Sequence, residues 1–199
     1  MMKDSILFSH AQIDRMNALA KSIHPNLLVS YYYNPKLFCE HSSDKERFWT
    51  ALTNLYSLFF DCSPFLFRGM HRGLFRYLSS YWRCSDSELR TPQNLISFVY
   101  ALQELRSWYC HNKHQNLNYK MELIGGLGRT IRTVFNADPL RLPANDFDYH
   151  FALEQLENKA HNMFVSLETT LQALKGDVEN GVATSLTLVD IYPAKNKLS

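Results

Sequence analysis

The spacing of apolar residues is the feature that most constrains the fold, because it follows the period of an α-helix through most of the 199 residues. Two segments depart from it. HPNLLVSYYYNPKLFCEHSS, at 24–43, is bounded by prolines and predicts an irregular connection. The tail TSLTLVDIY alternates weakly, which is compatible with a short β element, a hairpin or no regular structure. We therefore predict one all-α domain over 1–199, a bundle of about five to six helices with residues 176–199 as a C-terminal tail. The predicted helices cover about 11–23, 43–59, 64–81, 91–105, 119–135 and 148–175.

Local signals indicate where several of these helices begin and end. Ser43 followed by Glu46 has the form of a capping box, in which each residue satisfies a free backbone amide of the other. Thr91 followed by Pro92 predicts a helix start, because threonine caps the first turn and proline fits within it. Gly176 suits the position just past the end of the last helix.

The composition is that of an ordinary soluble globular protein, with 46% apolar residues, 20% charged residues and a net charge of +2. Such a small net charge gives no general attraction to nucleic acid or membranes. The richest apolar stretch, LYSLFFDCSPFLF, is interrupted by Asp61, Ser63 and Pro64, so no membrane span is predicted. The four cysteines are far apart and form no CxxC pair, which favours reduced thiols in a cytoplasm. We expect neither a metal nor a cofactor.

The run LRSWYCHNKH at 105–114 carries an arginine in the apolar stripe of a helix and then a histidine cluster. On an ideal helix Arg106 lies about 20° from Leu95, within that stripe. A buried guanidinium is costly unless it is paired or used, so Arg106 has either a partner that the sequence does not reveal or a wet, functional position. His111 follows about 140° further round, so two copies of the chain related by a twofold axis could bring paired Arg and His groups into one cleft.

The same ten residues resemble the R-x4-6-H signature of the HEPN superfamily, helical-bundle proteins many of which are metal-independent ribonucleases. The family often has Asn, Asp or His directly after the arginine, where this chain has Ser107. The resemblance implies a homodimer with a composite catalytic site in which Arg106 and His111 act on RNA. It also implies a setting such as a toxin–antitoxin pair or phage defence, with an antitoxin or regulatory protein as a further partner.

The chemistry of these residues suits RNA cleavage. Without a metal, the neighbouring 2′-OH attacks the phosphorus and leaves a 2′,3′-cyclic phosphate and a 5′-OH. His111 can exchange protons near neutral pH, and Arg106 offers a planar fork of donors to the charge that develops on the phosphate. Ser107 and Asn112 would orient the phosphate or the imidazole. His114 is either a second proton carrier or a solvated loop histidine.

An architectural interpretation of the same motif stays open. Arg106 could pair with a carboxylate of another helix, and His111 could end its own helix, where a cation is favoured by the helix dipole. The chain would then be a regulatory or scaffolding bundle without nuclease activity.

A basic stretch, PFLFRGMHRGLFRYLSSYWR at 64–83, is the second candidate feature, and no acidic residue occurs from 64 to 85. Its arginines alternate with aromatic residues, a mixture that suits phosphate contacts together with stacking on bases. The alternative is a solvated helix face whose arginines pair with carboxylates of neighbouring helices. If this stretch alone is functional, the chain is a non-catalytic module that binds RNA or an acidic protein. The candidate RNA-binding residues are Arg68, His71, Arg72, Arg76 and Arg83.

Overall fold

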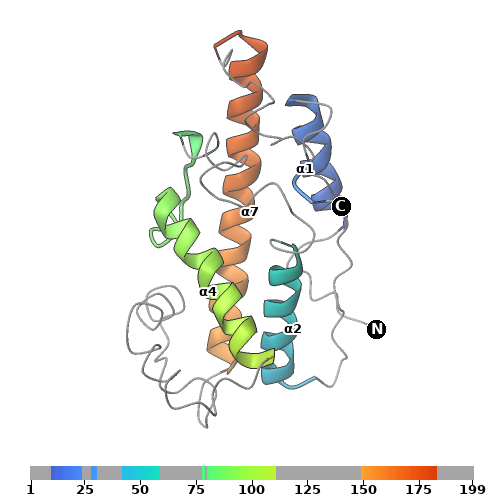
Figure 1. The fold of residues 1–199 in the computed structure, drawn as a ribbon, viewed down its shortest axis with the longest axis vertical. Coiled ribbons are helices and arrows are strands. Elements are labelled where there is room, and N and C mark those ends of the chain that lie inside the picture. Colours follow the sequence, from blue (N-terminus) through green and yellow to red (C-terminus); the bar gives the residue numbers. More distant parts are fainter. Residues whose placement is uncertain are drawn as a thin grey trace, which may run out of the picture. The chain divides into compact units, whose positions relative to one another are not determined.

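The computed structural model describes residues 10–23, 28–30, 42–58, 78, 80–110 and 149–182. Within these ranges the regular structure is helical and no strand occurs, which confirms the all-α prediction for this part of the chain. The predicted helix at 119–135 and the tail that could hold a β element lie outside the described residues, as does most of the predicted helix at 64–81. Figure 1 shows the helices α1 (His10–Ile23), α2 (Asp44–Tyr56), α4 (Pro92–Cys110) and α7 (Tyr149–Glu179).

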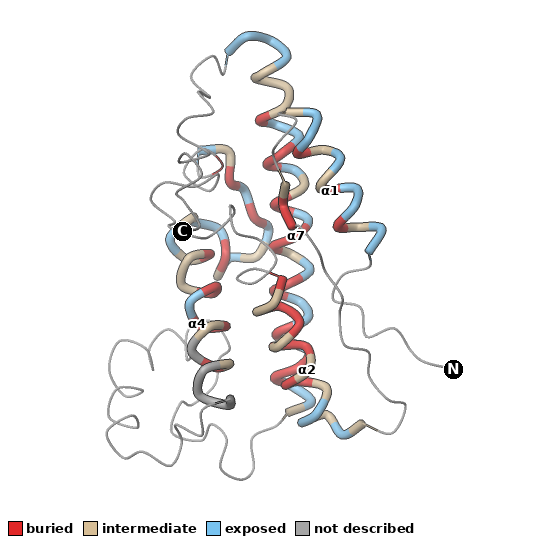
Figure 2. The backbone as a smooth tube through the Cα atoms, turned by 45° about the vertical axis from the view of Figure 1, so that its right-hand side comes forward, coloured by how far each residue is buried: buried red, intermediate tan, exposed pale blue. Residues whose placement is uncertain are grey.

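Helix α2 begins with the predicted capping box. The Ser43 amide donates a hydrogen bond of 2.8 Å to the Glu46 carboxylate, and the Glu46 amide donates one of 3.3 Å to the Ser43 hydroxyl. This reciprocal pair satisfies two amides that would otherwise lack acceptors at the helix start. Figure 2 shows buried residues along the length of α2. They are Phe48, Trp49, Ala51, Leu52, Asn54 and Leu55.

Helix α4 also begins as predicted. The Thr91 hydroxyl accepts a hydrogen bond of 3.2 Å from the Asn94 amide, and its carbonyl accepts one of 3.1 Å from the Leu95 amide. The apolar stripe then packs α4 against α2. The helix extends to Cys110, beyond the last apolar residue of the predicted stripe. The buried residues of that stripe are Leu95, Phe98, Val99, Leu102 and Leu105.

Helix α7 has 31 residues and ends later than the sequence predicts. The placing of the helix end at Gly176 is wrong, because α7 continues through this glycine to Glu179. The residue that caps this end is Gly181, whose φ of 71° is the left-handed conformation typical of the position just past a helix. The Gly181 amide bonds the Val178 carbonyl at 3.2 Å and the following amide bonds the Asp177 carbonyl at 2.9 Å, a Schellman motif.

The chain divides into two compact units, and α7 contributes to both. Among the described residues, unit 1 contains α2, residues 84–110 with α4, and Tyr149–Met163 of α7. Unit 2 contains α1, residues 28–30, residues 57–58, residue 78, residues 80–83, and α7 from Phe164 onward.

Aromatic rings fill part of the unit 1 interior. Phe48 lies edge-on to Trp49 at 5.0 Å and to Tyr149 at 5.8 Å between ring centroids, and Trp49 lies 6.5 Å from Tyr149. Edge-to-face contacts at these distances are favourable because the positive ring edge meets the negative ring face. They join the start of α7 to α2.

An asparagine side chain holds the backbone of residues 29 and 30 within unit 2. The Asn17 carboxamide oxygen accepts hydrogen bonds from the amides of Val29 (2.9 Å) and Ser30 (3.1 Å), and its nitrogen donates to the Ser30 carbonyl at 2.8 Å. One carboxamide therefore satisfies three backbone groups of residues 29 and 30.

An ion pair of 3.1 Å between Arg15 and Glu168 links α1 to α7 in the same unit.

None of the helices in the described part of the chain combines the length and the apolar character that crossing a membrane requires.

Candidate functional site

Arg106 lies one turn before the end of α4, beside the buried stripe of that helix. Its immediate neighbour Leu105 is only 1% exposed, whereas Arg106 itself is partly exposed. The helical period brings the arginine to the edge of the core and leaves its guanidinium at a position that solvent can reach.

The partner of Arg106 is an aromatic ring. Its guanidinium carbon Cζ lies over the ring of Tyr56, 4.6 Å from the centroid, and Tyr56 is the last residue of α2. This is a cation–π contact, in which the positive charge is attracted to the negative face of the ring. No carboxylate among the described residues forms an ion pair with Arg106. The contact therefore holds the charge without neutralising it.

Little of the remaining motif falls within the described part of the chain. Ser107 belongs to α4, but its side chain is outside the described residues, as are His111, Asn112 and His114. The proximity of Arg106 and His111 therefore stays a prediction.

Of the basic stretch at 64–83, the structure describes one candidate side chain, Arg83, and it belongs to unit 2. Arg83 is exposed, and its Nη1 donates to the carbonyls of Trp82 at 2.7 Å and Ser80 at 3.3 Å. No ion pair joins it to a carboxylate in the described ranges. Arg68, His71, Arg72 and Arg76 lie outside those ranges.

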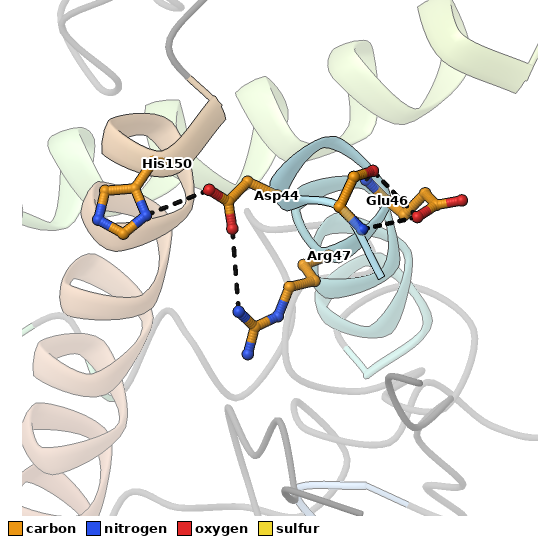
Figure 3. Close-up of polar contacts among 5 residues, drawn as sticks. Asp44, Glu46, Arg47 and His150 are labelled. Carbon is orange, nitrogen blue, oxygen red and sulfur yellow. Dashed lines mark hydrogen bonds and ion pairs between the residues drawn. The ribbon is translucent and has the colours of Figure 1, made fainter. Parts of the chain in front are cut away.

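A polar cluster that sequence analysis did not single out joins the beginnings of α2 and α7 in unit 1. Figure 3 shows the Asp44 carboxylate between two cationic or titratable side chains. One oxygen lies 3.3 Å from His150 Nδ1 and the other lies 3.8 Å from Arg47 Nη1. The side chains of His150 and Asp44 are 76% and 41% exposed, so this cluster is a solvated contact and its electrostatic energy is small.

The charge of Arg47 also affects the pKa of Glu157, a carboxyl group of α7. Burial raises the pKa of Glu157, the positive charge of Arg47 opposes this rise, and the negative charge of Glu154 adds to it. Arg47 lies in α2 and Glu157 lies in α7, more than a hundred positions apart. No sequence motif could therefore indicate that they interact.

A buried ammonium is the second feature that the sequence does not reveal. Lys159 of α7 is 5% exposed and forms an ion pair with Glu88 in the turn before α4. Asp86 in the same turn accepts hydrogen bonds from the Glu88 amide at 2.8 Å and from the Asn162 side chain at 3.5 Å. These contacts fasten the turn to α7.

Metal chemistry finds no ready ligand set in the described ranges, which hold no group of three or more His, Cys, Asp or Glu side chains able to bind an ion together. Comparisons with protein-family models, with curated proteins and with solved structures find no match to this chain.

Proposed function

We propose that the chain is a metal-independent endoribonuclease in which Arg106 and His111 act at a composite site formed by two copies of a five- to six-helix bundle. The observation that carries this proposal is the state of Arg106, whose guanidinium is partly exposed, rests against the Tyr56 ring and is not paired with any described carboxylate. An ion pair with a carboxylate would neutralise the guanidinium, and the stacked ring does not. A retained positive charge at the edge of the core suits a phosphate ligand.

The proposed reaction needs proton transfer and charge stabilisation only. The 2′-OH loses its proton and attacks the adjacent phosphorus, the bond to the 5′-oxygen breaks, and that oxygen gains a proton. We assign one of these protons to His111 and the other to its counterpart in the second copy. Arg106 stabilises the extra negative charge on the phosphate oxygens. Ser107 and Asn112 orient the groups, and His114 is a second candidate proton carrier. The proposed setting is a cytoplasmic toxin or phage-defence effector with a regulatory partner.

The test is the incubation of purified protein with RNA in EDTA. We expect cleavage to survive chelation, to leave 2′,3′-cyclic phosphate and 5′-OH ends detectable by mass spectrometry, and to disappear in Arg106→Ala and His111→Ala. Arg90→Ala is the matched control, because Arg90 is an exposed arginine just before the same helix. RNA that stays intact with folded, helical protein would reject the proposal.

A second candidate function rests on Arg83. This exposed guanidinium donates to backbone carbonyls and not to a described carboxylate, so its charge stays available to a ligand. The corresponding proposal is a non-catalytic module that binds RNA or an acidic protein through Arg68, His71, Arg72, Arg76 and Arg83. It predicts salt-dependent binding that Arg72→Ala and Arg76→Ala abolish and Arg83→Ala weakens, while Arg106→Ala leaves it intact.

A further inference from the structure

Tyr56 and Arg106 stand fifty positions apart in the sequence and meet where α2 ends and α4 nears its end. The guanidinium carbon lies 4.6 Å from the centre of the ring. Both backbones are anchored beside this contact, because Leu55 is 0% exposed and Leu105 is 1% exposed. The contact therefore joins two side chains whose starting points are fixed by the core.

The kind of contact matters for what Arg106 can do. A carboxylate partner would restrain the guanidinium but would also neutralise its charge and occupy its N–H donors. An aromatic face restrains the same group through its quadrupole and adds no negative charge. Arginine has a long, flexible side chain, and ordering it when a phosphate binds costs entropy. A fixed ring orders the side chain beforehand and so lowers this cost.

The backbone departs from α-helical geometry directly after Tyr56. The two residues that follow it, Ser57 and Leu58, form a π-helical turn at the end of α2. Such turns in otherwise regular helices occur frequently at functional positions. Within this turn, Leu58 is 1% exposed.

We propose that Tyr56 is the positioning residue of Arg106, and that its ring holds the guanidinium in the orientation that receives the scissile phosphate of RNA. This inference rests on the proposed ribonuclease function. The ring acts through Arg106 and does not itself need to touch the substrate. The face of the ring carries the effect, and the phenolic hydroxyl does not.

The experiment compares Tyr56→Leu, which removes the ring, with Tyr56→Phe, which keeps it. We expect Tyr56→Leu to lower kcat roughly ten- to hundred-fold with little change in KM, because orientation and charge stabilisation act mainly in the transition state. Tyr56→Phe should stay within about threefold of the wild type. Because Arg106→Ala alone is expected to abolish cleavage, the double variant Tyr56→Leu/Arg106→Ala is used only to measure the coupling of the two side chains in stability.

A readout that does not need nuclease activity accompanies these measurements. The equilibrium unfolding of four proteins is compared: the wild type, Tyr56→Leu, Arg106→Ala and the double variant. The two side chains should show a coupling of about two- to fivefold in the unfolding equilibrium constant. In NMR spectra, the ring should shift the side-chain resonances of Arg106 upfield, and this shift should persist in Tyr56→Phe and vanish in Tyr56→Leu.

The outcomes separate the two proposals. If the wild type cuts RNA and Tyr56→Leu cuts it equally well, or if Tyr56→Phe is as slow as Tyr56→Leu, the positioning role is rejected while the ribonuclease stands. If the wild type leaves RNA intact, the ribonuclease proposal fails and takes the catalytic purpose of Tyr56 with it. The unfolding cycle and the resonance shift then still decide whether the ring holds Arg106 at all.

Discussion

Lys159 and Glu88 form an ion pair in which the ammonium is buried and the carboxylate is partly exposed, with side-chain exposures of 6% and 41%. A buried charge is tolerated only when it has a partner, and Glu88 is the carboxylate that supplies it. This asymmetry means that the two partners are not equivalent for the stability of unit 1.

Removal of the Glu88 charge should therefore be the more damaging change. We expect Glu88→Gln to lower the free energy of unfolding by about 1–3 kcal/mol, because the buried Lys159 side chain loses its ion-pair partner. Lys159→Met is the matched variant: it removes the buried charge, keeps the side-chain volume, and should cost less than about 1 kcal/mol. Urea denaturation of both variants checks this. A larger loss in Lys159→Met than in Glu88→Gln would contradict the account.

Gly176 and Gly181 should respond in opposite directions to replacement by alanine. Gly176 lies inside α7, so Gly176→Ala should stabilise the protein by about 0.5–1 kcal/mol through helix propensity. Gly181 has a φ of 71°, so Gly181→Ala should destabilise it by about 1 kcal/mol. An added Cβ meets no atom within 4 Å at either position, so the backbone conformation alone decides the sign. Thermal unfolding of the two variants measures the difference, and equal shifts would be evidence against a left-handed cap at 181.

Tyr81 should stabilise unit 2 at neutral pH and lose this effect in alkali. Its hydroxyl donates a hydrogen bond of 2.5 Å to Asp177, and this bond raises the pKa of Tyr81 above its ordinary value of 10.0. A raised folded-state pKa means that the contribution is complete below pH 10.0 and is lost as the pH rises through the folded value.

The corresponding variant is Tyr81→Phe, which should lower the free energy of unfolding by about 1 kcal/mol at pH 7, since the bond is partly exposed. The difference from the wild type should shrink on the alkaline side. Tyr100→Phe is the control, because Tyr100 is 49% exposed. A gap between wild type and Tyr81→Phe that persists at high pH would show that the hydroxyl acts in some other way.

Glu46 should stabilise the start of α2 only while it is ionised. Hydrogen bonds from the Ser43 amide and hydroxyl lower the pKa of Glu46 below its ordinary value of 4.5. The stability that it contributes is therefore present above pH 4.5 and is lost as the pH falls through the lower folded value. The melting-temperature difference between the wild type and Glu46→Gln should follow this course, and a difference that is independent of pH would refute it.

Arg106 should not be replaceable by lysine. Arg106→Lys keeps the positive charge but loses the planar fork of donors, so we expect RNA cleavage to fall at least roughly tenfold. Arg90→Lys, just before the same helix, should leave the rate unchanged. Cleavage by Arg106→Lys at the wild-type rate would mean that charge alone suffices at this position.

Local signals in the sequence predicted the described helices well. The capping residues Ser43 and Thr91 begin α2 and α4 as expected, because a cap is a contact between residues three positions apart. The predicted end of α7 is wrong, because two glycines, Gly176 and Gly181, follow its apolar stripe and either could cap the helix. The choice of Gly181 is visible only in its backbone conformation.

The partners of charged side chains could not be predicted in the same way. The sequence predicts for Arg106 either a hidden partner or a wet position. In the structure its guanidinium contacts Tyr56, a ring on another helix that no sequence motif indicates. The burial of Lys159 could not be predicted either, since a lysine beside apolar residues usually reaches solvent. Its burial depends on the placing of Glu88 by a turn that is distant in the sequence.

The Asn17 carboxamide has a consequence for how this protein can change over evolutionary time. It gives one donor and two acceptor contacts to the main chain of residues 29 and 30, a combination that aspartate cannot offer and that glutamine would deliver from a longer arm. Diverged descendants should thus keep asparagine here while substitutions accumulate at 29 and 30 within the limits of their burial. Asparagine at position 17 would then help to identify distant relatives whose remaining sequence has diverged.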